Sequence, residues 1–229
     1  SGISMFVIAA VTMSMIAILS AFNGIEDLVQ DLFGTLDADL AVVPLSGEVL
    51  PNELGEIIGE YPGVAVYSAV IESEAIIRGN GLTQICSVIG VDAQYGDVSR
   101  IDSAIVEGTW GRSFENSQCV CLGYGIRSEM GIRADSILPP LMSLGAPVRG
   151  KKLSRHRERA FRTLPALACG TFSINADLDT RYVLAPLEFA RELFDRPNEV
   201  SRFEIQIDEG VSAAQLATDE NFIAALGEN

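Results

Sequence analysis

The sequence has few of the residues from which catalytic and metal sites are usually built. It contains one histidine, His156, and 4 cysteines without a CxxC pair, so a zinc site would need an unusual set of ligands. No GxSxG motif occurs, and a single histidine within a basic run is a poor general base because neighbouring positive charges oppose its protonation. Asp177 and Asp179 resemble paired carboxylates, but a lone Asp-Leu-Asp is typical of turns. We predict that the chain is not an enzyme and binds no cofactor or metal.

Basic residues are also scarce. The 229 residues include 16 Lys and Arg against 31 Asp and Glu, which gives a formal net charge of −15. Nucleic-acid binding needs a basic face, so this balance excludes nucleic acid as the main partner. Disordered, collagen-like and coiled-coil classes are excluded too, because 48% of the residues are hydrophobic and no G-X-Y or heptad repeat occurs. The length fits one large domain or two small ones.

The sequence opens with a long apolar stretch. No charge precedes Glu26, and a helix over residues 2–22 is long enough to cross a hydrocarbon layer of about 30 Å. The hydroxyls of Thr12 and Ser14 can bond to carbonyls of the same helix. The alternatives are a buried helix of a soluble core and a signal peptide, for which a basic start and a cleavage site are lacking. We predict that residues 1–23 are most of a transmembrane helix, and the missing initiator methionine indicates a fragment.

The helical pattern continues beyond the apolar stretch, but with one polar face. Apolar residues recur at helical spacing while acidic and amide residues take the other side. The apolar positions are Ile25, Leu28, Val29, Leu32, Phe33 and Leu36, and the polar ones are Glu26, Asp27, Gln30 and Asp31. We therefore predict a stalk helix over residues 24–36, with Asn23-Gly24 as a point where a bend is favoured.

The remaining sequence alternates between short strand and helix patterns. Strands are predicted at 38–43, 64–71, 74–78, 83–91 and 203–207, and helices at 52–61, 125–130 and 186–194. Gly79-Asn80-Gly81 is typical of a hairpin turn, and Pro186 suits a first helical turn. Together these patterns indicate an α+β body on a membrane stem.

The cysteines leave two interpretations open. Cys119 and Cys121 lie two apart in a predicted strand, so their side chains point the same way and are poorly placed to bond to each other. We expect four buried, apolar thiols rather than a metal or redox site. The open alternative is a disulfide between Cys86 and Cys169, provided that the domain lies in an oxidising compartment.

Charge is distributed unevenly along the chain. Residues 149–162 (RGKKLSRHRERAFR) contain 7 of the 16 Lys and Arg residues of the chain, and Glu158 is the one acidic residue among them. This segment fits a solvated loop, attraction to anionic lipid headgroups, or docking onto an acidic partner. It does not fit a nucleic-acid site, because the acidic remainder of the chain would repel phosphate.

Several short motifs, in order along the chain, resemble those of the MacB/LolC/LolE/FtsX-type ABC transporter permeases. The run Ser20-Ala21-Phe22-Asn23-Gly24-Ile25 is similar to the end of the family's first membrane helix, and Val88-Ile89-Gly90-Val91-Asp92 to its GVD strand end. Further similar runs are Ile105-Val106-Glu107-Gly108 with Cys121-Leu122-Gly123, residues 126–136, Cys169-Gly170-Thr171-Phe172, and residues 182–187 and 200–205. The sequence departs from the pattern at Ala134-Asp135-Ser136, where the family has Gly-Asp, and in its longer basic run.

The resemblance implies a MacB-like periplasmic core domain of α+β class. In that fold a porter-like subdomain of βαβ units would take residues 37–104 and 166–229, and a Sabre-like insert would take residues 105–165. It further implies a bacterial inner-membrane protein with this domain on the periplasmic side, more membrane helices, a cytosolic ABC ATPase subunit, and a second permease copy or paralogue.

In the lipoprotein-releasing branch of the family, a β-hairpin hook captures a soluble periplasmic lipoprotein chaperone. Residues 139–164 occupy a similar place, which makes their basic residues the expected partner-binding set: Arg149, Lys151, Lys152, Arg155, Arg157 and Arg159. We expect a LolC/LolE-like permease that couples ATP hydrolysis to periplasmic cargo handling. The alternatives are MacB-like efflux of drugs, peptides or toxins, FtsX-like regulation of a cell-wall hydrolase, and a membrane-anchored binding or sensor domain.

Overall fold

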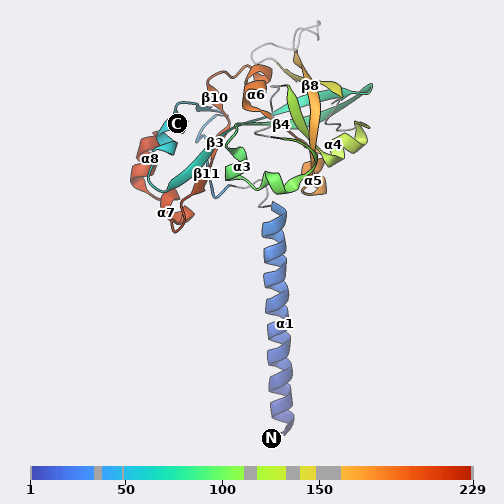
Figure 1. The fold of residues 1–229 in the computed structure, drawn as a ribbon. Helices are drawn as coiled ribbons and strands as arrows, with labels where there is room; N and C mark the ends of the chain where they lie inside the picture. Colours follow the sequence, from blue (N-terminus) through green and yellow to red (C-terminus); the bar gives the residue numbers. More distant parts are fainter. Residues whose placement is uncertain are drawn as a thin grey trace.

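The computed structural model describes residues 2–33, 38–47, 49–110, 118–132, 140–147 and 161–227. A long helix, α1 (Gly2–Phe33), stands clear of a head built from strands and short helices (Figure 1). The head mixes antiparallel and parallel strand pairs with helices on both sides, so the predicted α+β class is confirmed.

Helix α1 runs from the predicted membrane span into the predicted stalk as far as Phe33, and residues 34–36 of the predicted stalk lie outside the described residues. It stays helical through Asn23-Gly24, where the sequence favours a bend. The window Met5–Phe22 is long and apolar enough to cross a membrane, and none of it is buried against the head. The hydroxyls of Thr12 and Ser14 donate to the carbonyl oxygens of Ile8 and Ala10 at 2.7 and 2.9 Å. The alternative of a helix buried in a soluble core is therefore wrong for this structure, and the hydroxyls of Thr12 and Ser14 are satisfied in a way that suits lipid.

The head is organised around a nine-stranded sheet in the order β1-β11-β3-β4-β9-β6-β8-β5, with β7 paired to both β3 and β8. The strands are β1 (Leu40–Val42), β3 (Val64–Gly79), β4 (Leu82–Val91), β5 (Ile105–Gly108), β6 (Cys119–Gly123), β7 (Leu141–Pro147), β8 (Phe161–Phe172), β9 (Tyr182–Pro186) and β11 (Arg202–Ile207). A second, two-stranded sheet pairs β2 (Leu50–Pro51) with β10 (Glu199–Val200).

Part of the large sheet closes on itself. Because β7 joins β3 to β8, the strands β3, β4, β9, β6, β8 and β7 are hydrogen-bonded in a closed circuit, which we call the strand ring. The pairs β4–β9 and β6–β8 are parallel and the others are antiparallel. Ile77, Val88, Val120, Leu144 and Val183, one from each of five of these strands, belong to one fully buried cluster. Closure leaves these strands without an open edge over the paired stretches.

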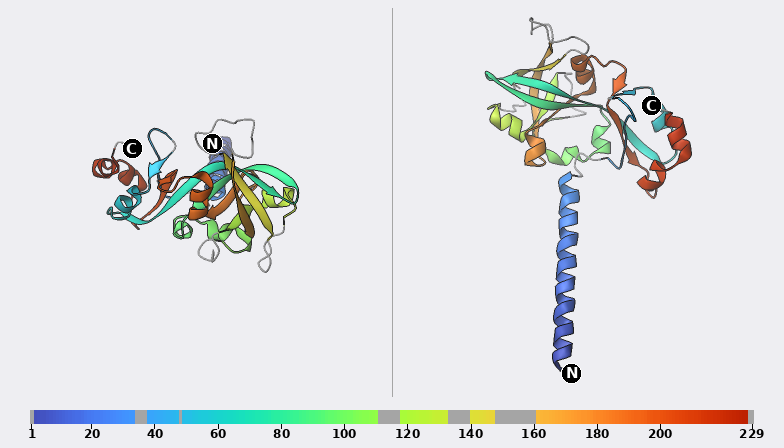
Figure 2. Two further views of the ribbon diagram at one scale, coloured as in Figure 1. Left: turned by 90° about the horizontal axis from the view of Figure 1, so that it is seen from above. Right: turned by 180° about the vertical axis from the view of Figure 1, so that it is seen from behind.

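Short helices cover the sheet. Helices α2 (Leu54–Gly59), α7 (Ala213–Ala217) and α8 (Glu220–Leu226) lie at one end of the head, and the strand ring lies at the other (Figures 1 and 2). Helix α3 (Tyr95–Val98) and the 3₁₀ helix η1 (Ile101–Ala104) lie on the side facing α1, whereas α6 (Leu187–Phe194) lies on the opposite side, and α4 (Tyr124–Glu129) and α5 (Ala176–Asp179) flank the ring.

Helix α6 packs unusually close to β4. A Cβ atom added at Gly90 would lie 2.1 Å from the Cβ of Ala190, so only glycine fits at this point of the strand. The apolar face of α6 packs into the buried cluster through Leu187, Phe189 and Leu193. The predicted helix over 186–194 is confirmed, with Pro186 as its cap residue.

The predicted strands 64–71 and 74–78 are one strand, β3. Glu72 and Ser73 interrupt the apolar pattern, but the Glu72 carboxylate accepts a hydrogen bond from Arg202 at 2.6 Å and its backbone N–H donates to Ser201 Oγ at 2.9 Å. These contacts let a polar residue continue the strand. The predicted hairpin turn is confirmed at Asn80-Gly81, where both residues have positive φ, 51° and 77°.

Candidate functional site: a hairpin at the end of the head

The basic segment singled out in the sequence connects two paired strands. β7 and β8 form an antiparallel hairpin whose register runs from Leu141 opposite Leu167 to Pro147 opposite Phe161. The chain therefore leaves the hairpin at Pro147 and returns to it at Phe161. The six predicted partner-binding residues, Arg149, Lys151, Lys152, Arg155, Arg157 and Arg159, all fall in this connection and lie outside the described residues.

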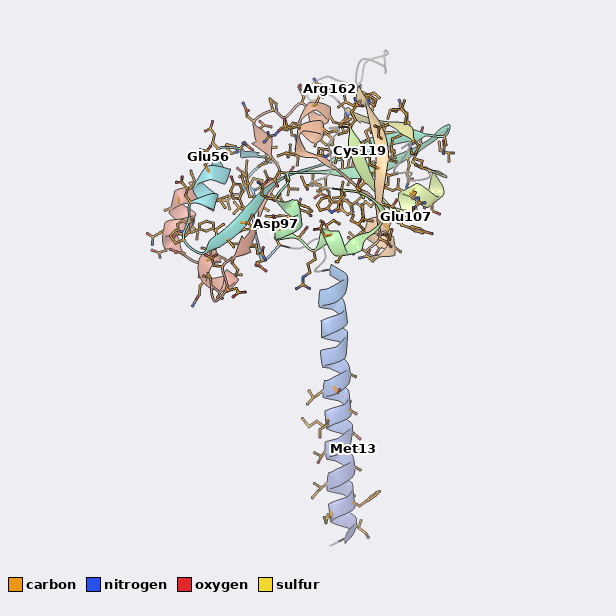
Figure 3. All side chains as sticks on the ribbon, viewed as in Figure 1. Met13, Glu56, Asp97, Glu107, Cys119 and Arg162 are labelled. Atoms are coloured by element: carbon orange, nitrogen blue, oxygen red, sulfur yellow. A yellow bond between two sulfur atoms is a disulfide. The ribbon has the colours of Figure 1, made fainter. Side chains whose placement is uncertain are left out.

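The end of this hairpin lies on the side of the head away from α1. Arg162, one residue into β8, is labelled there in Figure 3, far from the helix. A membrane around α1 would thus lie on the opposite side of the head.

Arg162 ties the loop end of the hairpin, next to the connection, to the end of α6. Its guanidinium donates to the carbonyl oxygen of Glu192 at 2.6 Å and pairs with the Asp195 carboxylate at 2.9 Å. Asp195 ends the helix in the left-handed conformation, with φ 58°. A cation at the carboxyl end of a helix is favourable because unpaired carbonyls concentrate negative charge there. The hairpin is thereby held near its loop end by a helix of the core.

A cleft of about 520 Å³ lies beside this anchor, between the start of β8 and α6. Arginines and carboxylates share its walls with apolar residues, so it offers a polypeptide surface both charged and apolar contacts. Arg191 in the wall is held by Glu188 at 2.7 Å and by Asn52 Oδ1 at 2.6 Å. The complete lining is Gln118, Arg162, Leu164, Pro165, Glu188, Phe189, Arg191, Glu192, Asp195 and Pro197.

The cysteine prediction is wrong for two of the four residues. Cys119 on β6 and Cys169 on β8 form a disulfide with their Cα atoms 5.4 Å apart, so the alternative pair of Cys86 with Cys169 is wrong as well. The reason is topological: β6 and β8 are parallel neighbours with a bulge between Val120 and Cys121, an adjacency that the sequence does not reveal. The bond fixes the strand that carries the hairpin, and such bonds persist in oxidising compartments.

Cys86 and Cys121 are buried free thiols, as predicted. Burial raises the pKa of the Cys86 thiol to about 12 and also raises the pKa of Cys121. Neither is a thiolate near neutral pH, so neither is suited to redox or nucleophilic chemistry.

Of the acidic residues Asp177 and Asp179, the second has the structural role expected of it. The Asp179 carboxylate accepts hydrogen bonds from Ser173 Oγ at 2.7 Å and from the backbone N–H of Ile174 at 2.8 Å. Asn175 caps α5 by accepting from the N–H of Leu178 at 3.0 Å. The turn chemistry is confirmed, and within the described ranges no group of His, Cys, Asp and Glu is arranged to hold a metal ion.

Sequence reasoning missed a charged cluster beneath α3. The Arg202 guanidinium pairs with Glu72 at 2.6 Å and with Glu204 at 2.7 Å, and Glu204 is only 4% exposed. Burial disfavours the charged guanidinium, but the two carboxylates outweigh this and raise the pKa of Arg202 above its ordinary value. The alternation along residues 203–207 indicated that Glu204 and Gln206 lie on a polar face of a strand. The sequence did not show that α3 packs against this strand and so buries Glu204.

Comparison with known protein families and solved structures identifies the family of this chain. The family model of the MacB-like periplasmic core domain matches residues 1–219. The chain belongs to that family. The resemblance seen in the short motifs is thus confirmed, and the chain is the extracytoplasmic domain of a MacB-like ABC transporter permease. No curated protein sequence matches it.

Two solved structures share the fold of this MacB-like periplasmic core domain. The periplasmic region of MacB from Actinobacillus actinomycetemcomitans aligns with a TM-score of 0.59 at 12% identity, covering 87% of this chain and 88% of that one. The extracellular domain of the noncanonic ABC-type transporter YknZ from Gram-positive bacteria aligns with a TM-score of 0.55 at 12% identity, covering 78% and 88%. At such low identity the likeness shows the fold alone.

Proposed function

We propose that this MacB-like domain belongs to the permease subunit of a lipoprotein-releasing transporter, and that residues 148–160 receive a periplasmic lipoprotein chaperone. The observation that carries the proposal is the pairing of Pro147 with Phe161, since it makes the most basic segment of the chain the connection of a hairpin far from α1. The permease would sit in a bacterial inner membrane with a cytosolic ABC ATPase and a second permease copy or paralogue, and this domain itself would catalyse no reaction.

Charge gives the hairpin a physical reason to select an acidic partner. The basic segment stands on a chain with a net charge of −15, so its field is local and directional. Complementary charge across an interface raises the association rate and fixes orientation more than it raises affinity. An acidic face of the chaperone would therefore be drawn to the hairpin and repelled by the rest of the head.

Helix α1 provides a route for the ATPase cycle to act on the head. It runs without a break over 32 residues from the span to the stalk. An unbroken helix resists compression because each turn is hydrogen-bonded to the next, so a shift of the span is passed to the head rather than absorbed. We further propose that the head is divided into a porter-like unit, residues 37–104 and 166–229, and a Sabre-like insert, residues 105–165.

The test uses the complete permease in its own membrane. All six basic residues of the hairpin connection are replaced by alanine, and crosslinking to the periplasmic chaperone is measured over a range of salt concentrations. We expect the variant to lose most of the crosslinking at low salt and nearly all of its salt dependence. A matched control replaces Arg78 and Arg100, which are exposed basic residues elsewhere on the head, and should change neither.

Two outcomes would contradict this proposal. Unchanged chaperone capture by the six-residue variant at every salt concentration would remove the role of the hairpin. Capture of an efflux adaptor or a cell-wall hydrolase by the wild type, without a lipoprotein chaperone, would replace lipoprotein release by one of the other family roles.

A further inference from the structure

The end of the head opposite the strand ring carries an apolar groove. We call residues 38–71 and 203–227 the acidic lobe; it contains β1, β2, α2, the first part of β3, β11 from Phe203 onward, α7 and α8. A groove of about 320 Å³ runs between β1 with the chain that follows it and α8. Its floor is the buried core, formed by Leu50, Leu54 and Phe222.

The walls of the groove are apolar and open to solvent. Val43 is 58% exposed, Leu45 is 85% exposed and Ile223 is 52% exposed, although all three line the same groove. Among the described strands β1 pairs only with β11, so the outer edge of the sheet is open beside the groove. An open strand edge next to an apolar hollow is the arrangement that other polypeptides bind.

The charge of the lobe defines what can bind there. Neither residues 1–77 nor residues 203–229 contain a Lys, Arg or His. Several carboxylates of the lobe lie next in sequence to groove residues: Asp39 precedes Leu40, Glu53 precedes Leu54, and Asp219 and Glu220 lie just before Phe222. The other described carboxylates of the lobe that are not paired with Arg202 are Glu56, Glu60, Asp208 and Glu209. The cations at its border are engaged elsewhere, Arg191 by Glu188 and Arg202 by Glu72 and Glu204.

We propose that this groove binds a cationic amphipathic peptide segment. Its apolar side chains would fill the hollow between Leu45 and Ile223, and its Lys or Arg side chains would lie against the surrounding carboxylates. A second copy of this chain docked groove to groove would bring two acidic surfaces together, and an anionic lipid surface would be repelled for the same reason. The site is separate from the basic hairpin and does not depend on lipoprotein release.

The test measures peptide binding to the whole 229-residue chain in nanodiscs of phosphatidylcholine. The probe is a fluorescent octapeptide of alternating Leu and Lys, and the comparison peptides alternate Ser with Lys and Leu with Glu. Fluorescence anisotropy, corrected with empty nanodiscs, should show the Leu–Lys peptide binding at least about tenfold more tightly than either of the others. Its affinity should also fall as salt is added, because the carboxylates contribute to it.

A matched pair of variants locates the site. Leu45→Ser with Ile223→Ser removes both exposed walls of the groove and should weaken binding of the Leu–Lys peptide about tenfold. Leu82→Ser with Ile85→Ser makes the same chemical change at side chains of the strand ring that are 51% and 70% exposed, and should change the affinity less than twofold. Because all four side chains are exposed, both variants are expected to stay folded, which circular dichroism checks.

Three results would overturn the proposal. They are equal binding of the Leu–Glu peptide, unchanged affinity in the groove variant, and loss in that variant of a self-association that sedimentation velocity detects in the wild type. The last would assign the groove to a second copy of the chain.

Discussion

The two ends of the head are built from one sheet but held together in different ways. The strand ring closes its hydrogen bonding through β7 and carries the disulfide between Cys119 and Cys169. The acidic lobe ends in the open edge of β1 and is held by side-chain packing of α2 and α8. The ring also carries the basic hairpin, whereas the lobe has no basic residue at all.

This difference divides β3 into two parts with different partners. Its first residues, from Val64 to Val70, pair with β11 in the lobe, and the rest, from Val70 to Gly79, pair with β4 in the ring. One buried cluster runs through both ends, including Phe222 in the lobe and Leu144 in the ring. The ring is thus the rigid support, and the lobe is the end expected to open first, because local stability follows closure and packing.

The largest expected effect comes from removing the covalent bond of the ring. Cys119→Ala with Cys169→Ala should lower the free energy of unfolding by about 4 kcal/mol, because the bond joins residues 50 apart in sequence and restricts the unfolded chain. Urea unfolding followed by circular dichroism measures the change. A thiol reductant should lower the midpoint of the wild type but not that of the variant. Equal midpoints for the oxidised wild type and the variant would show that closure of the sheet alone holds the ring.

A buried aromatic residue tests whether the lobe opens on its own. Phe222 is 3% exposed and its ring centroid lies 4.8 Å from that of Tyr61. Phe222→Ala should cost about 3 kcal/mol and speed hydrogen exchange in β1, α2 and α8 while leaving β6 and β8 protected. Phe194→Ala in α6, where the phenyl is 6% exposed, is the matched control and should instead affect the ring. Loss of protection throughout the head in the Phe222 variant would mean that both ends unfold as one unit.

The anchor of the hairpin should matter much less for stability. Arg162 and Asp195 have side chains that are 35% and 55% exposed, so solvent screens their ion pair and its loss should cost at most about 1 kcal/mol. Arg162→Ala should therefore shift the thermal midpoint only slightly, as should Arg181→Ala at another exposed arginine. A loss as large as that of the disulfide would show that the loop end of the hairpin is part of the core of the ring.

Local chemistry predicted the elements whose causes lie within a few residues. The turn at Asn80-Gly81 follows from residues that tolerate positive φ, and the helix over 187–194 follows from Pro186 and an apolar face at helical spacing. The long apolar run before Glu26 likewise predicted α1. What these features share is that no distant partner is needed to produce them.

Features that depend on strand neighbours were not predictable in this way. The disulfide requires β6 to lie beside β8, and the continuity of β3 requires Arg202 to reach Glu72. Composition located the basic segment, but only the register of β7 on β8 makes it the connection of a hairpin. The groove could not be predicted either, because two of its walls, Leu45 and Ile223, come from opposite ends of the head's sequence.

The smallest expected effect is a pH dependence confined to the lobe. Tyr61, just after α2, donates its hydroxyl to the carboxylate of Asp219, the cap of α8, at 2.8 Å. This hydrogen bond, together with the backbone N–H of Asn221, lowers the pKa of Asp219. Burial, with the adjacent carboxylate, raises the pKa of Tyr61.

The two shifts predict losses of stability at opposite ends of the pH scale. A carboxyl whose folded pKa is depressed stabilises the fold above its ordinary pKa of about 4 and loses that contribution as the pH falls through the folded value. A phenol whose folded pKa is raised contributes below its ordinary pKa of about 10 and loses that contribution as the pH rises further. Tyr61→Phe should therefore lower the unfolding midpoint by a constant small amount between about pH 5 and 9, with the gap narrowing on both sides. Tyr124→Phe, at a tyrosine that is 52% exposed, should leave the profile unchanged. A gap of equal size at pH 3 and pH 7 would mean that this bond does not join α2 to α8, and the lobe would then depend on apolar packing alone.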